Sequence, residues 1–224
     1  MAVVWRAAVI AVVGYLLGSV PFAVIVSKVF WGIDVRRHGS GNTGATNVLR
    51  VFGVAPGVLV LVLDAMKGAA AVLFAQSLAF SAPGVFAADW LPVLGATAAI
   101  AGHVFSPFLG WRGGKGVATA AGVIVVIAPH VVLYLIVMFL IIVAITRTVS
   151  IGSVSIAIAF PLMVIWRYPD RSALLVFALC TAATVVWRHR ANMVRIVHGE
   201  ETKIDFKRRL FDPAKHGRDR TKES

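Results

Sequence analysis

The sequence predicts an all-α integral membrane protein with seven transmembrane helices. The first observation is composition: the chain of 224 residues is 59% hydrophobic and only 14% charged. Its mean hydropathy of +0.86 lies far outside the range of soluble globular domains. The second is that apolar residues gather in long runs, and a helix needs about 20 such residues to cross the hydrocarbon core. The third is the placement of positive charge, which sets the number of crossings.

The net charge of +12 does not indicate a nucleic-acid-binding protein, because the basic residues lie in loops and a tail between the apolar runs. That distribution is typical of the charges that orient membrane proteins, and it also suits an anionic ligand. A single cysteine, Cys180, excludes an intramolecular disulfide. The first 30 residues lack a convincing signal-peptide cleavage site, so we interpret them as a retained transmembrane helix.

The apolar runs predict the spans in order along the chain. They lie at residues 3–30, 54–78, 91–109, 154–166 and 172–187, and a longer apolar region at 117–145 is interrupted by Pro129 and His130. Residues 211–224 form a charged cytoplasmic tail without apolar periodicity, which we expect to be disordered. Residues 1–210 then form a single transmembrane domain.

The positions of lysine and arginine decide how many spans the region 117–145 contains. Most of them lie in the loops at 31–50 and 109–116 and in the tail, so the positive-inside rule places all three segments in the cytoplasm. An even number of crossings must then separate Lys115 from Arg188. One helix over the apolar region would give three crossings, whereas a turn at its proline gives four. The count is then seven, with two short helices beside the proline, the N-terminus outside and the C-terminus in the cytoplasm.

One charged pair lies inside the second span. Asp64 and Lys67 are three residues apart and therefore share a helical face. Charges at that depth are costly, so we expect the pair to face the protein interior. It is either a structural ion pair or a direct participant in chemistry.

A polar stretch between the first two spans, residues 36–50, has the composition of a phosphate-binding loop. It contains three glycines, small hydroxyl and amide side chains and flanking arginines. Glycine lets backbone N–H groups turn toward an anion, and Thr46 or Asn47 is expected to cap a following helix whose N-terminus adds partial positive charge. The alternative is a basic, flexible connector at the membrane surface.

Two other polar segments lie on the same predicted face of the membrane. One is the segment 113–116, in which glycines surround Lys115. The other continues the last span and places three polar side chains on one helical face: His189, Asn192 and Arg195. Cations near glycine-rich backbone suit a phosphate, while amide and imidazole groups suit hydroxyls and a carbonyl. Together the three segments predict a site for a phosphorylated ligand.

Several motifs are missing from the sequence. It contains no Gly-x-x-x-x-Gly-Lys-[Ser/Thr] pattern, which excludes a P-loop ATPase, and no His-x-x-x-x-Asp pattern of the usual glycerolipid acyltransferases. No cluster of carboxylates or histidines has metal-ligand spacing, so a magnesium-dependent head-group transferase is not expected. We therefore expect no cofactor.

Six motifs follow one another along nearly the whole chain: Gly18-Ser19-Val20-Pro21, Ser40-Gly41-Asn42-x-Gly44-Ala45-Thr46-Asn47-x-x-Arg50, Asp64-x-x-Lys67-Gly68, Gly102-His103-x-Phe105-Ser106-Pro107 with Gly113-Gly114-Lys115-Gly116-Val117-Ala118-Thr119, Ser150-x-Gly152-Ser153, and His189-Arg190-x-Asn192. In these motifs the chain closely resembles the bacterial acyl-phosphate:glycerol-3-phosphate acyltransferases, which are integral membrane enzymes. One departure is Trp111-Arg112, where the family more often has Phe-Lys, and this keeps the charge. The family's seven-span fold with cytoplasmic motif loops agrees with the count from charge.

The resemblance implies transfer of an acyl group from acyl phosphate to the 1-hydroxyl of glycerol 3-phosphate, which gives lysophosphatidic acid and phosphate in the first acylation of phospholipid synthesis. The catalytic residues would be Ser40, Arg50, Lys115, His189 and Asn192. The residues expected to bind substrate are Gly41, Asn42, Thr46, Asn47, His103, Gly113, Gly114, Ser153 and Arg195. Arg50 and Lys115 would hold the phosphate of glycerol 3-phosphate, while the loops at 40–42 and 113–114 would hold the acyl phosphate.

The resemblance also implies that the substrate's own phosphate takes the hydroxyl proton. An acyl phosphate is a mixed anhydride with a good leaving group, so positioning and charge neutralisation supply much of the rate. The alternatives are a covalent intermediate on Ser40, or His189 as general base, since a histidine titrates near neutrality. His103 is expected to orient the glycine loop.

The residues leave two other functions open. One is a transporter for a phosphorylated molecule or an anionic lipid, although the polar motifs lie on one face and no internal repeat is visible. The other is a membrane scaffold whose basic tail binds acidic lipids. As an acyltransferase the protein is expected to be a monomer in the plasma membrane, with its site on the cytoplasmic side and the acyl-phosphate-producing enzyme as a candidate partner.

Overall fold

The computed structural model describes residues 2–80 and 84–204, and this part of the chain is helical, with loops between the helices. The helices are α1 (Ala2–Ser19), α2 (Phe22–Trp31), α3 (Ala45–Phe52), α4 (Val54–Phe80), α5 (Val85–Val104), α6 (Val117–Ile127), α7 (Pro129–Thr146), α8 (Val149–Arg167), α9 (Ser172–Arg188) and α10 (Arg190–Val197). Two short 3₁₀ turns, η1 (Val35–Arg37) and η2 (Pro107–Leu109), lie in the loops. The predicted tail at 211–224 and the predicted domain end at 210 lie outside the described residues.

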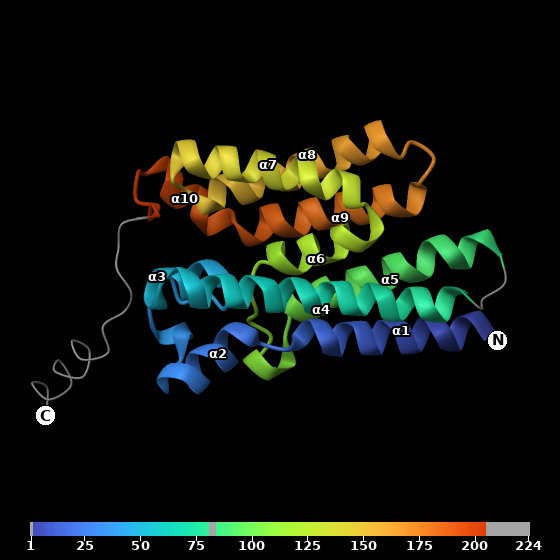
Figure 1. Cartoon of the computed structure of the whole chain (residues 1–224), viewed down its shortest axis with the longest axis horizontal. Helices are drawn as coiled ribbons and strands as arrows, with labels where there is room; N and C mark the ends of the chain where they lie inside the picture. Colours follow the sequence, from blue (N-terminus) through green and yellow to red (C-terminus); the bar gives the residue numbers. More distant parts are fainter. Residues whose placement is uncertain (1, 81–83, 205–224) are drawn as a thin grey trace, which may run out of the picture.

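The long helices form two layers (Figure 1). Helices α1, α4 and α5 make one layer, α7, α8 and α9 make the other, and the short α6 lies between them. The largest cluster of buried apolar side chains joins the layers, and the rings of Phe160 and Phe177 meet edge to face within it. Helices α2, α3 and α10 gather at the end of the molecule that is opposite the N-terminus. The polar segments at 36–50 and 189–195 are therefore at one end of an apolar bundle.

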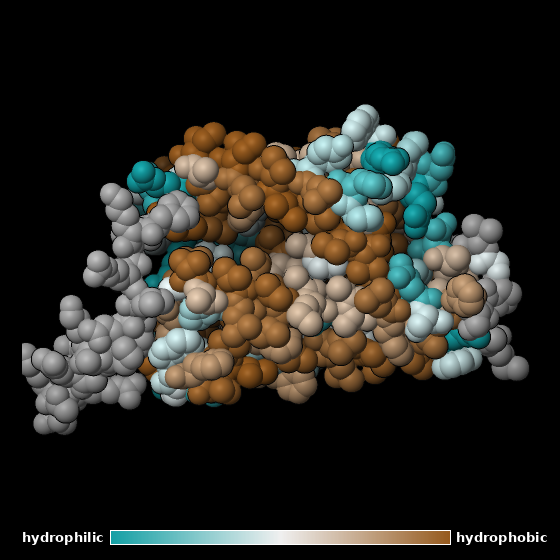
Figure 2. Space-filling view, viewed as in Figure 1, coloured by the Kyte–Doolittle hydropathy of each residue, from teal (hydrophilic) through white to brown (hydrophobic). Residues whose placement is uncertain are grey.

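Five helical segments are long and apolar enough to span a membrane: Val3–Trp31, Val54–Phe80, Ala87–Leu109, Pro129–Thr146 and Val149–Arg167. A sixth span results if α9 and α10, which meet at a bend of 53°, are taken together. Helix α6 is apolar but has only 11 residues. Figure 2 shows a broad apolar band across the middle of the molecule, with hydrophilic residues toward its ends. The protein is therefore a multi-pass integral membrane protein, as predicted.

The predicted break in the region 117–145 is confirmed, but only one of the helices beside it is short. Helix α7 starts at Pro129, where proline fits because the first residue of a helix needs no N–H partner. It then runs for 18 residues to Thr146, which is long enough to span. The expectation of two short helices is therefore wrong for α7. The first predicted span is also interrupted, because Pro21 breaks the backbone hydrogen bonds between α1 and α2.

Candidate functional site

The loop before α3 is held in shape by one buried side chain, Asn47. Its Oδ1 accepts a hydrogen bond from the amide of Ser40 at 2.8 Å, and its Nδ2 donates to the carbonyls of Val35 and His38, both at 3.1 Å. Asn47 therefore fixes the fold of the loop, and its amide group is used within the protein. The expected capping by Thr46 or Asn47 is wrong, because α3 begins one residue after Gly44 and both residues lie in its first turn.

The same loop and the helix α3 that follows it contain buried polar atoms that have no hydrogen-bond partner among the described residues. They are Oδ1 of Asn42, Oγ1 of Thr43 and Nε of Arg50. A buried polar group without a partner is unfavourable, commonly by about 1–3 kcal/mol. Water or a polar ligand supplies the missing partner of such atoms.

The glycine loop between η2 and α6 is held from two sides. The amides of Gly113 and Gly114 donate to the carbonyls of Val104 and His103, at 3.0 and 3.1 Å. The guanidinium of Arg188 donates to the carbonyls of the same two glycines, at 2.7 and 3.1 Å. Both glycine amides are thus committed within the protein, so they do not act as N–H donors to a ligand in this geometry. The loop instead presents the side chain that follows, Lys115.

A chain of hydrogen bonds connects Lys115 to the opposite layer. Its Nζ donates to Oδ1 of Asn192 at 2.6 Å, and Nδ2 of Asn192 donates to Oγ of Ser150 at 2.9 Å. Ser150 in turn donates to Oε1 of Glu201 at 2.7 Å, and the Asn192 amide donates to the same oxygen at 2.7 Å. Side chains from the glycine loop, α8, α10 and the segment after α10 therefore form one network.

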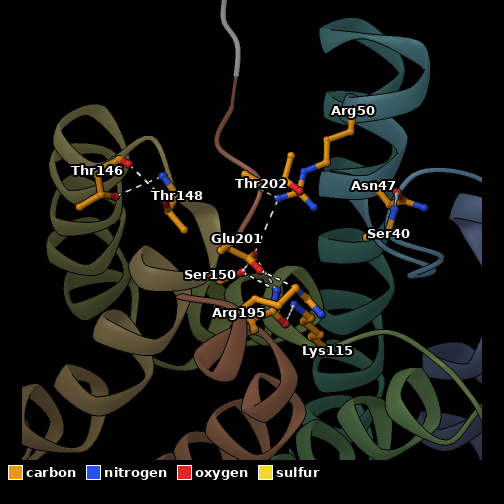
Figure 3. A network of polar contacts seen from close by, with 11 residues as sticks. Ser40, Asn47, Arg50, Lys115, Thr146, Thr148, Ser150, Arg195, Glu201 and Thr202 are labelled. Atoms are coloured by element: carbon orange, nitrogen blue, oxygen red, sulfur yellow. Dashed lines mark hydrogen bonds and ion pairs between the residues drawn. The ribbon is translucent and has the colours of Figure 1, made fainter. Parts of the chain in front are cut away.

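The carboxylate of Glu201 is the centre of a cationic cluster (Figure 3). Nε of Arg195 donates to its Oε2 at 2.9 Å, and Nη2 of Arg50 lies 3.9 Å from Oε1. Arg50 also donates to the carbonyl of Thr202 at 2.9 Å, which ties α3 to the segment after α10. One carboxylate thus faces the charges of Arg50, Lys115 and Arg195, which leaves about two positive charges uncompensated. A phosphate group carries about two negative charges near neutral pH.

Two pKa shifts, of Lys115 and of Glu201, describe the electrostatics of the cluster. Burial, together with the neighbouring arginines, lowers the pKa of Lys115 to about 8, although Glu201 opposes this effect. Burial would raise the pKa of Glu201, but the hydrogen bonds from its three donors outweigh it and the pKa is lowered. At neutral pH the cluster therefore holds a protonated lysine and an ionised carboxylate.

His189 lies at the junction of α9 and α10 and is only 2% exposed. Its Nδ1 lies 2.8 Å from the carbonyl oxygen of Val185. A carbonyl oxygen only accepts, so Nδ1 carries the proton and Nε2 is the basic nitrogen of the neutral ring. This tautomer leaves an acceptor that suits a hydroxyl group.

The structure brings together four of the predicted residues and separates others from them. Arg50, Lys115, Asn192 and Arg195 converge on one cluster, as described above. Ser40 is exposed on the loop before α3, and Figure 3 shows it apart from that cluster. The contact of α8 with Asn192 comes from Ser150, whereas Ser153 is buried three residues later on the same helix. His103 is buried behind the glycine loop, which agrees with a role in orienting that loop.

The sequence analysis missed three members of the site: Arg188, Glu201 and Ser150, the last of which it quoted only within a motif. Arg188 directly precedes the motif that contains His189 and Asn192, and this position is the only signal that the sequence offers for it. Glu201 follows Glu200 in a polar segment, and the sequence does not distinguish between the two acidic residues. Only the fold shows that Glu201 contacts α8 and α10.

Comparison with known proteins gives a consistent result. A family profile described as glycerol-3-phosphate acyltransferase matches residues 8–199. A glycerol-3-phosphate acyltransferase of Parasynechococcus marenigrum is 42% identical over 92% of this chain and 93% of its own length. One of Bacillus cytotoxicus is 42% identical over 87% of this chain and 93% of its own length.

Two crystal structures of PlsY (YgiH), an integral membrane glycerol 3-phosphate acyltransferase, share the fold. The glycerol 3-phosphate form has a TM-score of 0.80 and 35% identity, and it covers 89% of this chain and 96% of that one. The lysophosphatidic acid form has a TM-score of 0.78 and 35% identity, with 89% and 95% covered. The prediction of an acyltransferase is confirmed, and the chain belongs to the family of integral membrane glycerol-3-phosphate acyltransferases.

Proposed function

We propose that the protein transfers an acyl group from an acyl phosphate to the 1-hydroxyl of glycerol 3-phosphate. The products are lysophosphatidic acid and inorganic phosphate, in the first acylation of bacterial phospholipid synthesis. The observation that carries this proposal is the cluster of Arg50, Lys115 and Arg195 around a single carboxylate, because its excess positive charge matches a phosphate dianion. The two similar PlsY structures are a glycerol 3-phosphate form and a lysophosphatidic acid form, which supports the proposed substrate and product.

The cationic cluster is the proposed site for the phosphate of glycerol 3-phosphate. Arg50 and Lys115 would contact the phosphate oxygens, since both groups lie in the cluster and each is a strong donor to phosphate. Asn192 positions Lys115, and Arg195 adds charge from α10. The basic Nε2 of His189 and the hydroxyl of Ser153 are assigned to the glycerol hydroxyls.

A second anionic group requires a second site, and the loop before α3 is the proposed location. Asn42 and Thr43 each keep a buried polar atom without a partner among the described residues, and the exposed Ser40 and Gly41 adjoin them. We assign this loop, including Thr46 in the first turn of α3, to the head of the acyl phosphate. Gly113 and Gly114 line the site by allowing close approach of their backbone, while Asn47 and His103 are assigned to positioning and not to substrate contact.

The proposed reaction is a direct transfer. The 1-hydroxyl oxygen attacks the acyl carbonyl carbon, the bond from that carbon to the phosphate oxygen breaks, and the phosphate leaves with the electron pair. A phosphate of the substrates takes the hydroxyl proton, which is reasonable because a phosphate monoester has a second pKa of about 6. The protein then contributes position and positive charge, and needs no nucleophile of its own.

The proposed topology has seven crossings, with α6 as the short one. It places the N-terminus outside and the polar end of the bundle, which contains α2, α3 and α10, in the cytoplasm. Support comes from the basic residues at that end, including Arg36, Arg37, Arg190 and Arg195. We also propose that the protein lies in the cell membrane of a bacterium, that it is a monomer, and that it contacts the enzyme that produces the acyl phosphate.

The test is an assay of purified protein in lipid with glycerol 3-phosphate and one of three donors: palmitoyl phosphate, palmitoyl-CoA or palmitoyl-carrier protein. Of the three donors, we expect only palmitoyl phosphate to give lysophosphatidic acid and phosphate. A mock preparation from the same host without this protein, in the same lipid, is the control for contaminating activity. Product only with one of the other donors would contradict the proposed donor, and no product with any donor from folded protein would contradict the proposed reaction.

A further inference from the structure

The ion pair in the second span is buried and has no part in the proposed reaction. As the sequence predicts, Asp64 and Lys67 face the interior: their side chains are 2% and 4% exposed, and Nζ lies 2.7 Å from Oδ1. The ammonium of Lys67 also donates to the carbonyl of Val20 at 2.8 Å, at the break between α1 and α2. Burying two charges is costly, and a well-packed apolar pair of similar volume is often as stable. Stability alone therefore does not account for the pair.

A third buried group, His103, connects this pair to the glycine loop. Its Nδ1 lies 3.7 Å from Oδ1 of Asp64, and its carbonyl accepts the amide of Gly114 at 3.1 Å. The other side of the ring faces the loop, because a Cβ added at Gly114 would overlap Nε2 of His103. The imidazole is thus held between the carboxylate of Asp64 and the backbone of the loop.

The loop has little freedom once that ring is fixed. Arg188 donates to the carbonyls of Gly113 and Gly114 from the side of α9, so the two glycines lie between the guanidinium and His103. The next residue is Lys115, whose Nζ reaches Asn192 at 2.6 Å. A shift of the imidazole would therefore be transmitted to the ammonium of Lys115.

We propose that Asp64, paired with Lys67, is a positioning residue for acyl transfer, which holds His103 against Gly114 and thereby places Lys115 at the substrate phosphate. The carboxylate orients the imidazole, and Lys67 orients the carboxylate from the next turn of α4. This inference rests on the proposed role of Lys115. It assigns a function to a charged pair that lies beneath the phosphate site and does not contact it.

The experiment separates positioning from a purely structural role by removing both charges together. In Asp64→Asn/Lys67→Met neither partner is left as an uncompensated buried charge, so we expect a melting temperature in detergent close to that of the wild type. Because the ring is no longer fixed, we expect kcat/KM for glycerol 3-phosphate to fall about tenfold, with the KM for acyl phosphate unchanged. A double variant with wild-type kinetics would overturn the proposal. The matched control is Asp89→Asn/Arg171→Gln, which removes an exposed ion pair of 3.2 Å between α5 and the start of α9 and should leave the kinetics unchanged.

A double-mutant cycle shows whether the effect passes through Lys115. In a Lys115→Ala background the ammonium is absent, so we expect the Asp64→Asn/Lys67→Met change to cost less than about twofold. An equal loss in both backgrounds would overturn the proposal, because the pair would then act on the site by another route. The same cycle also measures the effect of Lys115→Ala alone. If this variant had wild-type kinetics, the proposed role of Lys115 would be contradicted, and this outcome is distinct from a failure of the role of Asp64.

Discussion

The ammonium of Lys115 lies 2.6 Å from Oδ1 of Asn192, and this contact joins residues that are 77 positions apart in the sequence. It connects the glycine loop, which leads into α6, to α10 at the end of the last long helix. Asn192 is itself fixed by Ser150 and Glu201, so the position of the ammonium is set from two layers of the fold. A cation held in this way is preorganised for an anion and loses little freedom on binding.

Lys115→Ala should therefore weaken the use of glycerol 3-phosphate strongly. Loss of a charged hydrogen bond to phosphate is worth about 1.5–3 kcal/mol, which corresponds to a rise in KM of roughly 10- to 150-fold. Turnover should fall as well, because the hydroxyl is no longer held in place. Steady-state kinetics with varied glycerol 3-phosphate measure both effects. Lys28→Ala, which removes an exposed cation from α2, is the matched control and should behave as the wild type. Unchanged kinetics of folded Lys115→Ala protein would remove this residue from the site.

The pKa of Lys115, lowered to about 8, predicts the pH dependence of substrate use. Below that value the side chain is protonated and attracts the phosphate; above it the positive charge is lost. We expect kcat/KM for glycerol 3-phosphate to decline as pH rises through about 8, toward the level of Lys115→Ala. Lys115→Arg should abolish this decline, since a guanidinium stays charged up to a pH of about 12. A decline that persists in the arginine variant would assign the titration to another group.

Glu201→Gln should lower the free energy of unfolding and make the stability of the protein depend more strongly on bound inorganic phosphate. The change removes the charge that faces Arg50 and Arg195, and the remaining positive groups repel one another. We expect a loss of about 1–3 kcal/mol in the free energy of unfolding, because hydrogen bonds to a charged group are replaced. Thermal melting in detergent, with and without inorganic phosphate, measures this. Phosphate should raise the melting temperature of the variant more than that of the wild type, whereas equal shifts would show that the anion binds elsewhere.

Much of the fold could be predicted from the sequence because lipid imposes simple rules. Apolar runs located the long helices, and the positions of arginine and lysine led to the break before Pro129, which the structure contains. The break at Pro21 was not predicted, because a proline inside an apolar run is tolerated where neighbours satisfy the freed backbone groups. Here the carbonyl of Val20 at the break accepts from the amide of Phe22 and from the ammonium of Lys67, which is 47 residues away in the chain.

The candidate site was only partly predictable from the sequence. Residues that stand in local motifs could be found, whereas residues that join the site through contacts with distant parts of the chain could not. Arg50, Lys115 and Asn192 stand in motifs whose residue types suit phosphate, so the sequence identified them. Glu201 acts through Ser150, 51 residues away, and Arg188 acts through the glycine loop, 74 and 75 residues away. No local pattern indicates such contacts. The same applies to Asn47, whose amide suits a ligand by type but is used by the loop itself.

The proposed topology predicts the side of the membrane for two segments. A reporter fused after Ser224 should be found in the cytoplasm, and one inserted between α8 and α9, at residues 168–171, should be found outside. In the proposed topology the two sites are separated by one crossing, which α9 makes. Finding both reporters on the same side would contradict the proposed topology, and an external reporter after Ser224 would reverse the orientation.

Ser40 distinguishes direct transfer from a covalent mechanism. Its side chain is exposed on the loop before α3, while the basic nitrogen of His189 belongs to the junction of α9 and α10. A serine becomes a nucleophile when a base takes its proton within hydrogen-bond reach. We therefore expect no acyl-enzyme: the intact mass of wild-type protein incubated with palmitoyl phosphate, without glycerol 3-phosphate, should stay that of the free chain. Ser40→Ala protein treated identically is the control. An added palmitoyl group in the wild type that disappears in the variant would establish a covalent intermediate on Ser40, and the direct mechanism would be wrong.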